Sequence, residues 1–452
     1  YGFASIPERP DAVLFRNATV WTCGPQGRLQ QASVLVRDGK IAGVGDLAAP
    51  EGVTVIDATG KHITPGIIDC HSHIATDGGI NESGQTITAE VRIGDFVDPD
   101  DMAIYRQLAG GTTAANILHG SANTIGGQSQ VIRHRWGSGP EDVKFKTAPP
   151  GIKFALGENV KQSNWGDDHT TRYPQTRMGV EQIVRDAFEA ALDYRDAWDE
   201  WNRTGEGLPP RRDLELDALV EVLSGDRWIH CHSYRQDEIL ALMRTCEDYD
   251  VQIGTFQHIL EGYKVADAMA DHGVGASAFS DWWAYKIEVY DAIPYNGTLM
   301  HNAGVLVSFN SDNSELGTRL NLEAAKAVKY GGVPDVEALK FVTINPAIQL
   351  GIDDRVGSIE VGKDADLAIW SHSPLSTFTK CEQTWVEGRQ YFSREKDAEL
   401  RQRDDQMRAA LIQKILDRGG SSKKGQREGS KWPRHDEFCD HIDHTDDEEV
   451  ER

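Results

Sequence analysis

The hydrophobic pattern divides the chain into stretches with different local periods. Within residues 11–64, short apolar or alternating runs predict strands at Asp11–Phe15, Ser33–Arg37, Lys40–Val44 and Val53–Ile56. The dipeptide Asp38-Gly39 lies between the second and third runs, where it is a strong hairpin signal. This stretch contains no helix-length periodic segment, so it predicts a small all-β unit.

From residue 65 the pattern changes, and apolar runs alternate with helix-length amphipathic segments. The strand-like runs are Gly66–Asp69, Thr112–Leu118, Ile152–Leu156, Trp228–His232, Gln252–Gln257, Gly273–Ala278 and Gly304–Asn310. The helical segments are Asp100–Gly110, Val180–Asn202, Asp237–Tyr249, Tyr263–His272, Leu320–Tyr330 and Asp335–Val342. Such alternation predicts a parallel sheet, and about eight units predict a closed barrel. We therefore expect a (β/α)8 barrel over residues 65–349.

The strand pattern returns at Val356–Gly362, Ala365–Trp370 and Glu382–Tyr391. A barrel inserted into a β unit makes that unit discontinuous, so residues 1–64 and 350–395 are expected to form one small β-sandwich. The predicted fold class is thus α/β, a TIM barrel with a discontinuous β-sandwich formed by both chain ends. Residues 396–452 predict a charged helical segment followed, from Gly419, by a mobile tail without apolar periodicity.

Composition narrows the possible partners. Hydrophobic residues make up 39% of the 452 residues, enough for a large core, and the formal net charge is −24. This charge argues against nucleic acid and anionic membrane surfaces as partners, because both are polyanions. It leaves a small-molecule substrate open, since such a ligand responds to the local field of its pocket.

Cysteines and hydropathy add little about location. The six cysteines, at positions 23, 70, 231, 246, 381 and 439, form no CxxC pair and are too sparse for a disulfide scaffold. No run of about 18 apolar residues is present, so no membrane span is predicted. The chain begins with Tyr1 rather than Met, which leaves the compartment unknown: soluble, and either cytoplasmic or exported.

The first candidate for chemistry is the pair His71 and His73, directly after the run Ile67–Cys70. Two histidines at i and i+2 on a strand point to the same side, so both imidazoles can reach one ion. An H-x-H pair alone is a weak signal. Its position at the end of the first predicted barrel strand strengthens it, because barrel active sites lie at those strand ends.

The residues around this pair resemble a known family. The block Ile63–His73 (ITPGIIDCHSH) is similar to the signature of the amidohydrolase superfamily, and the block Val356–Leu367 (VGSIEVGKDADL) resembles its return into the sandwich. Thr343–Ala347 (TINPA) also matches. The resemblance covers roughly residues 11–395 and looks closest to the imidazolonepropionase-like and prolidase-like branch. It implies metal-dependent hydrolysis of a carbon–nitrogen bond, in an amide, cyclic amide or dipeptide.

The resemblance also implies further metal ligands, for one or two divalent ions with Zn²⁺ expected. The histidine of strand five is His230 or His232. We favour His230, which stands five residues before Arg235 as in prolidase-like members, while His232 could instead be the ligand or touch substrate. His258 matches the strand-six ligand, and Asp312 matches the strand-eight ligand and general base.

A two-metal site needs a bridging anion, a carboxylated lysine or a glutamate, and the run Gly151–Asn159 contains both types. Glu158 stands at the C-terminal end of the run, where a rim ligand belongs. Lys153 lies five residues earlier, or roughly 16 Å deeper along an extended strand. We therefore expect Glu158 to bridge and Lys153 to be a charge at the strand bottom.

Substrate contacts are expected from His119, His232, Tyr234, Arg235, Trp282 and Trp283. His119 precedes a Gly/Ser/Asn-rich loop at residues 120–128, and its alternative is a structural loop histidine. The tryptophans form an aromatic wall or pack under the helices. Arg235, with Tyr234, binds a substrate carboxylate or instead pairs with a nearby acid.

The expected mechanism uses a metal-activated water, with Asp312 taking its proton and passing it to the leaving amine. A deaminase of the same superfamily is the nearest alternative. Deaminases carry a glutamate two or three residues after the strand-five histidine, whereas the first acid after His230 is Asp237. A non-catalytic barrel scaffold is the alternative from another class, and it predicts no bound metal. The resemblance leaves a homo-oligomer possible.

Overall fold

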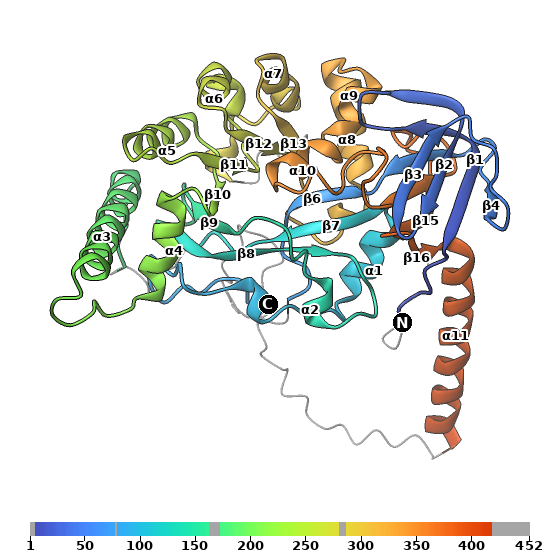
Figure 1. The fold of residues 1–452 in the computed structure, drawn as a ribbon, viewed down its shortest axis with the longest axis horizontal. Coiled ribbons are helices and arrows are strands. Elements are labelled where there is room, and N and C mark those ends of the chain that lie inside the picture. Colours follow the sequence, from blue (N-terminus) through green and yellow to red (C-terminus); the bar gives the residue numbers. More distant parts are fainter. Residues whose placement is uncertain (1–4, 77–78, 162–171, 280–285, 418–452) are drawn as a thin grey trace, which may run out of the picture.

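The computed structural model describes residues 5–76, 79–161, 172–279 and 286–417, and it contains two eight-stranded sheets (Figure 1). The barrel sheet follows the order β13-β12-β11-β10-β9-β8-β7-β6. Its strands are β6 Ile67–Ser72, β7 Thr112–Ile117, β8 Ile125–Arg133, β9 Gly151–Ala155, β10 Trp228–His232, β11 Ile253–Gln257, β12 Gly275–Ala278 and β13 Val307–Phe309. The expected barrel is therefore present, and seven of its strands lie on the runs that the sequence indicated.

The exception is β8, which lies antiparallel between β7 and β9. The Gly/Ser/Asn-rich residues 120–128 predict a loop, so this strand is not apparent from the sequence. Only residues 118–124 connect β7 to β8, and they hold no helix. A parallel neighbour needs a crossover of a dozen or more residues, so a strand that returns this soon runs antiparallel.

The two ends of the barrel sheet meet through residues that follow the strands. The backbone N–H of Asp312 donates to the carbonyl of His71 at 3.1 Å, which links the end of β13 to the end of β6. Helices surround the barrel on the outside (Figure 1). They are α1 Met102–Ala109, α2 Pro140–Val143, α3 Arg177–Thr204, α4 Leu214–Leu223, α5 Gln236–Asp248, α6 Ala266–His272, α7 Asn296–Asn302, α8 Leu320–Gly331, α9 Asp335–Lys340 and α10 Ile344–Gln349.

Local signals set the ends of the longest helix. The side chain of Thr176 accepts a hydrogen bond from the backbone N–H of Gly179, so it caps the start of α3. Gly205 ends the helix with φ at 64°, a left-handed conformation that glycine adopts without a steric penalty. The face of α3 that contains Val180, Val184 and Phe188 is buried against the barrel, which fixes this helix beside β9.

The second sheet joins both ends of the chain, in the order β16-β15-β14-β5-β1-β2-β3 with β4 beside β1. Its strands are β1 Ala12–Trp21, β2 Arg28–Arg37, β3 Lys40–Gly45, β4 Thr54–Asp57, β5 His62–Pro65, β14 Leu367–Trp370, β15 Cys381–Val386 and β16 Arg389–Ser393. Antiparallel pairing of β14 with β5 connects the two ends directly. A separate apolar core that includes Phe15, Val34, Leu367 and Trp385 stabilises this sheet.

A buried ion cluster holds the barrel against this sheet. Arg133, at the end of β8, is 1% exposed, and its guanidinium lies 2.6 Å from Asp364 and 3.4 Å from Asp366. It also lies over the ring of Phe145, 3.9 Å from the centroid. The two aspartates belong to the block that resembled the family's return segment, so in this chain that block carries the partners of Arg133.

We expect Arg133→Ala to destabilise the protein by about 3–5 kcal/mol, because it leaves the buried carboxylate of Asp366 without its cation, while Asp364 keeps Lys40 and Arg355. Arg92→Ala is the matched control, since Arg92 and Asp95 form a pair in which both side chains are 59% exposed. That change should alter the free energy of unfolding by no more than about 0.5 kcal/mol. Urea unfolding of both variants tests the expectation, and equal losses would contradict it.

A second buried group near this seam makes stability depend on pH. His134 is fully buried, its Nε2–H donates to Gln107 Oε1 at 2.9 Å, and burial lowers its pKa to about 4. The unfolded chain binds the proton at about 6.5, so the stability that the neutral ring contributes is complete above that pH. It is lost as the pH falls from about 6.5 towards 4.

We expect the melting temperature of the wild type to fall more steeply between pH 6.5 and 4.5 than that of His134→Gln, which keeps an amide donor but cannot titrate. The corresponding difference in the slope of the unfolding free energy should approach about 1.4 kcal/mol per pH unit, the value for one proton. Thermal unfolding monitored by circular dichroism at several pH values measures it. Parallel curves would show that His134 does not contribute.

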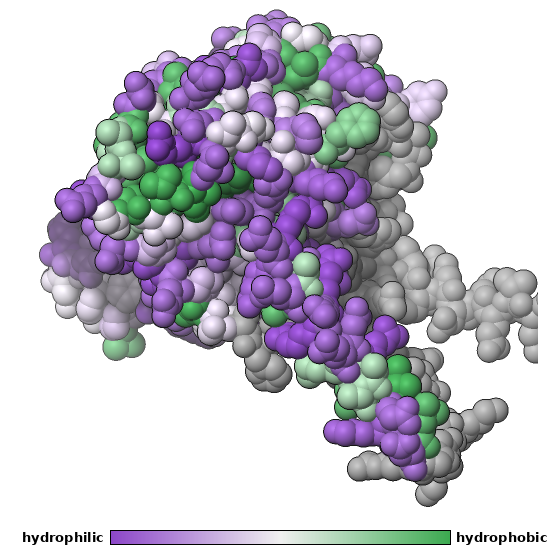
Figure 2. Space-filling view, turned by 90° about the vertical axis from the view of Figure 1, so that its right-hand side faces the viewer, coloured by the Kyte–Doolittle hydropathy of each residue, from purple (hydrophilic) through white to green (hydrophobic). Residues whose placement is uncertain are grey.

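The C-terminal helix α11, Arg394–Asp417, extends away from the body (Figures 1 and 2). Apolar side chains are exposed towards its free end, namely Met407, Leu411, Ile412, Ile415 and Leu416. The helical segment that the sequence predicted after residue 396 is present, and the expected tail from residue 419 lies outside the described residues. Within the described part of the chain, we find no helix with the length and apolar character needed to span a membrane.

Candidate metal centre

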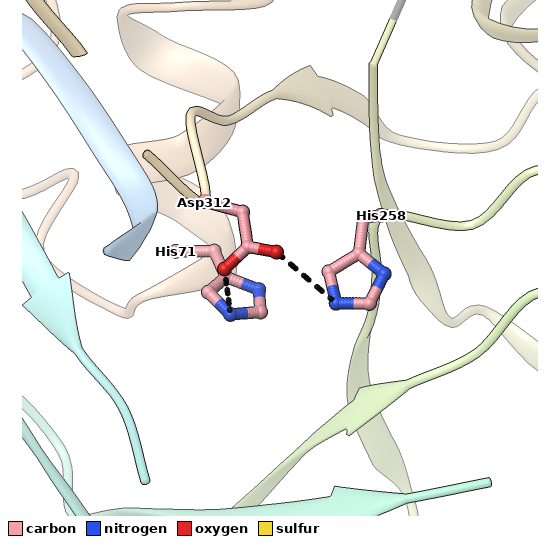
Figure 3. Close-up of side chains that lie close together, drawn as sticks. All are labelled: His71, His258 and Asp312. Atoms are coloured by element: carbon pink, nitrogen blue, oxygen red, sulfur yellow. Dashed lines mark ion pairs between the residues drawn. The ribbon is translucent and has the colours of Figure 1, made fainter. Parts of the chain in front are cut away.

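Three buried side chains from separate strands converge at the C-terminal end of the barrel (Figure 3). His71 lies on β6, His258 directly follows β11, and Asp312 follows β13. One ligand atom from each lies within 4.8 Å of the other two. Asp312 Oδ1 is 3.4 Å from His71 Nε2, and Asp312 Oδ2 is 4.0 Å from His258 Nε2. The sequence placed all three in a metal site, and the fold brings them together.

His73 joins the same group. Its Nε2 lies 3.0 Å from Asp312 Oδ1 and 3.3 Å from His71 Nε2. Its Nδ1 lies 2.8 Å from the carbonyl of Leu118, so Nδ1 carries the hydrogen and donates it. This bond orients the ring with Nε2 towards the cluster, which is the arrangement that outer contacts impose on metal-binding histidines.

The geometry favours His232 in the role that the sequence analysis gave to His230. The ring of His232 lies 4.3 Å from that of His258, centroid to centroid, and Ser121 Oγ lies 2.7 Å from His232 Nδ1. His230 lies one pleat deeper, against the backbone of Gly151, where an added Cβ would be 3.0 Å from His230 Nε2. The sequence could not separate them because both side chains point into the barrel.

The structure also differs from expectation in which of Lys153 and Glu158 reaches the cluster. Strand β9 ends at Ala155, so Lys153 is only two residues from the strand end and Glu158 lies beyond it in the following loop. The buried Lys153 Nζ reaches to 3.3 Å from His71 Nε2. Glu158 donates its backbone N–H to Glu288 at 3.0 Å. The expectation that Lys153 is a strand-bottom charge is therefore wrong, and a lysine inside a buried strand was the signal for its role.

Asp69 supports the cluster from below. Its buried carboxylate accepts hydrogen bonds from the backbone N–H and the hydroxyl of Ser311, and from the backbone N–H of His71 at 3.3 Å. Burial raises the pKa of Asp69 to about 7. These bonds fix the backbone at His71 and at Ser311, the residue before Asp312. This role of Asp69 is not apparent from the sequence, because it depends on a contact between residues 242 positions apart.

Two cluster residues adopt strained backbone conformations. His258 has φ at 36° and Asp312 has φ at 44°, in the left-handed region that non-glycine residues seldom occupy. Such conformations cost on the order of 1–3 kcal/mol each and persist where the surrounding structure imposes them. Both residues leave the end of a strand through this turn, which aims their side chains across the barrel axis at His71.

The chemistry of the donor set fits a divalent ion. Both ring nitrogens of the fully buried His258 lack a hydrogen-bond partner among the described residues. Burial, followed by the nearby charge of Lys153, lowers the pKa of His71 well below its usual range. Neutral imidazole is the form that binds a metal, and several histidines with one carboxylate suit Zn²⁺.

Among the expected substrate contacts, His119 is held by hydrogen bonds within its own loop region. Both ring nitrogens of His119 are engaged: Nδ1–H donates to Gly120 O at 2.9 Å, and Nε2 accepts the backbone N–H of Glu82 at 2.8 Å. Burial lowers the pKa of His119 to about 4. The alternative of a structural loop histidine therefore describes it. Trp282 and Trp283 lie outside the described residues.

Arg235 and Tyr234 point in different directions. Arg235 is 43% exposed and pairs with Asp237 at 3.0 Å, which is the alternative that the sequence left open for it. Tyr234 is fully buried, with its ring 4.6 Å from that of His232 and 5.1 Å from that of His258. Tyr234 thus lies directly beside the candidate centre, whereas Arg235 begins helix α5 at the surface.

A barrel with a buried cluster of histidines and an aspartate at its C-terminal rim defines a metal-dependent hydrolase of the barrel class. The amidohydrolase family model matches residues 297–390. An imidazolonepropionase of Psychrobacter cryohalolentis is 33% identical over 407 residues, covering 82% of this chain and 88% of that protein. The crystal structure of an amidohydrolase from Thermotoga maritima MSB8 has a TM-score of 0.79 at 32% identity, covering 84% of this chain and 100% of that one.

Another relative is longer. The amidohydrolase tasK of Hapsidospora irregularis is 32% identical over 427 residues, which make up 84% of this chain and 43% of that protein. The chain therefore spans less than half the length of that relative. The chain belongs to the amidohydrolase family, as the blocks Ile63–His73 and Val356–Leu367 indicated. This membership places it among hydrolases that act on carbon–nitrogen bonds.

We expect Ser121→Ala to weaken Zn²⁺ binding about 10–100-fold, because Ser121 Oγ orients the ring of His232. Ser224→Ala is the control, since Ser224 is exposed and bonds only its own turn and Asp226 among the described residues. Competition with a chromogenic chelator measures both affinities. Equal affinities in the two variants would remove His232 from the ligand set.

Proposed function

We propose that this protein hydrolyses an amide carbon–nitrogen bond at a divalent metal centre held by His71, His73, His232, His258 and Asp312. The observation that carries this proposal is the convergence of His71, His258 and Asp312, all fully buried, within 4.8 Å of one another. No other group of three potential ligands meets this criterion within residues 5–76, 79–161, 172–279 and 286–417.

When bound, the ion supplies Lewis acidity that lowers the pKa of a water and polarises the carbonyl under attack. Asp312 is the proton carrier: its Oδ1 lies 3.0 Å from His73 Nε2 and 3.4 Å from His71 Nε2, so the carboxylate faces the place where ligands converge. It accepts the proton of the water and delivers it to the leaving nitrogen. Tyr234 closes one side of the site with its ring against His232 and His258.

We further propose that Lys153, rather than Glu158, supplies the bridge of a two-metal site. Its Nζ lies 3.3 Å from His71 Nε2. A carbamate, formed when the neutral amine adds CO₂ and releases a proton, would stand beside this histidine and supply two anionic oxygens for metal ions. Glu158 contacts Glu288 through its backbone, in a loop beyond the strand. The metal count is therefore two where Lys153 is carboxylated and one where it is not.

For the substrate, a cyclic amide is the first candidate. A dipeptide carries a carboxylate, and Arg235 is the cation that the sequence offers for it. The surface ion pair of Arg235 with Asp237 removes this support for a dipeptide. A relative that is 33% identical over 88% of its length has a name, imidazolonepropionase, that specifies an imidazolone ring, a cyclic amide.

The metal count tests the ligand assignment. We expect about two zinc ions per chain in protein purified with added bicarbonate, and one or none in Lys153→Met, because a methionine cannot form a carbamate. Glu158→Gln should leave the count unchanged. Elemental mass spectrometry measures it. One ion in all three proteins would indicate a mononuclear site and revive the deaminase alternative, whereas no ion in the wild type would support the scaffold.

The role of Asp312 is tested by activity. We expect Asp312→Asn to lower kcat on any accepted cyclic amide by about 10²–10⁴-fold, because the amide cannot accept the proton. Asp193→Asn, an exposed change on α3, is the control. Initial rates at saturating substrate with zinc-loaded enzyme measure the effect. Retention of more than about a tenth of the wild-type rate in Asp312→Asn would contradict the proposed proton transfer.

A further inference from the structure

A cavity of about 420 Å³ lies away from the metal centre, and no residue of that centre lines it. It is formed where the N-terminal segment, α1, β16 and the start of α11 meet, on the side of the molecule from which α11 extends (Figure 1). Its volume lies within the range of pockets that bury a small organic ligand.

Three aromatic side chains line this cavity. Tyr105, Trp136 and Tyr391 are 6%, 4% and 8% exposed, so their rings form fixed walls rather than mobile surface groups. The rings of Tyr105 and Trp136 lie 5.9 Å apart at an interplanar angle of 54°. Aromatic walls set at an angle offer both a face and an edge to a planar guest, the two arrangements that aromatic pairs prefer.

One wall carries an unmet hydrogen-bond donor. The indole N–H of Trp136 has no hydrogen-bond partner among the described residues, although the residue is 4% exposed. Three other indoles, those of Trp21, Trp370 and Trp385, each donate to a side chain, whereas the buried indole nitrogens of Trp198 and Trp201 also lack a partner among the described residues. Trp136 differs from those two in lining the cavity, where its N–H can meet an acceptor on a ligand.

Two cations from α11 complete the lining. Lys396 and Arg403 pair with Glu399 at 3.0 Å and Asp404 at 2.7 Å on their own helix. The side chains of the cations are 66% and 51% exposed, and exposed pairs of this kind are weak, so both can turn to a ligand.

The remaining acid beside the cavity, Asp397, is already neutralised. Its carboxylate accepts hydrogen bonds from Tyr105 Oη at 3.2 Å and Arg401 Nε at 2.7 Å. No carboxylate of the described residues lines the cavity, whereas the cations Lys396 and Arg403 do, which favours a ligand that carries an anionic acceptor.

We propose that this cavity binds a planar aromatic carboxylate. The ring packs against the wall formed by Tyr105, Trp136 and Tyr391, and the carboxylate accepts from the indole N–H and from Lys396 or Arg403. A bound ligand would connect the barrel side, β16 and α11, so it stabilises the folded protein by mass action. The site is independent of the metal centre and does not depend on the proposed hydrolysis.

The test titrates the full chain with 2-naphthoate, a fluorescent probe of this class, and determines the stoichiometry by equilibrium dialysis. We expect one saturable site and a rise in melting temperature. The double variant Lys396→Met/Arg403→Met should weaken binding at least about tenfold, and Trp136→Phe about fivefold. Arg408→Met, elsewhere on α11, is the matched control and should bind as the wild type.

The uncharged analogue 2-naphthylmethanol separates recognition of the carboxylate from burial of the ring alone. It should bind at least about tenfold more weakly than 2-naphthoate. Equal binding of the two probes would overturn the proposal, because the cavity would then be only an apolar crevice. No saturable binding up to about 1 mM, or binding unchanged in the double variant, would overturn it as well.

Discussion

The buried carboxylate of Asp69 is the constraint on which the candidate active site depends. It stands on the first barrel strand and accepts two hydrogen bonds from Ser311, at the end of the last strand. A third bond comes from the backbone N–H of His71. The same carboxylate therefore joins the two edges of the barrel sheet and fixes the neighbours of Asp312. Loss of this contact would remove two of the hydrogen bonds that hold Asp312 close to His71.

The strain at His258 and Asp312 follows from this constraint. A strand that simply continued would carry its next side chains along the barrel axis, away from the opposite wall. The left-handed turns, with φ at 36° and 44°, redirect both side chains towards His71. The hydrogen bond from the Asp312 N–H to the His71 carbonyl offsets part of the conformational strain at Asp312. The stacking of the Phe279 ring on the His258 ring offsets part of the strain at His258. The strained turns thereby preorganise the candidate ligands, since the side chains need not rearrange to bind an ion.

A buried ion cluster around Arg133 joins the barrel to the second sheet, as Asp69 joins the two edges of the barrel sheet. Arg133 ends the antiparallel strand β8 and binds Asp364 and Asp366 of the segment that leads back into the second sheet. One end of β8 thus secures the seam between barrel and sheet. Beyond its other end, Ser121 and Leu118 orient His232 and His73 from the connection between β7 and β8. The irregular strand is therefore connected to both the stability of the fold and the geometry of the site.

Sequence alone determined the barrel, the joining of both chain ends and most of the candidate metal centre. Periodicity and strand-end position are local properties, and they indicated His71 and His73, whereas His258 and Asp312 came from the resemblance to the amidohydrolase superfamily. Only the tertiary structure decided between residues that share a strand. His230 and His232 point to the same side, so their depth against His258 separates them. Lys153, and not Glu158, lies beside His71 because β9 ends at Ala155, and only pairing with neighbouring strands sets that end. The antiparallel β8, the Asp69–Ser311 contact and the cavity beside α11 likewise rest on contacts between distant segments, which no local pattern encodes.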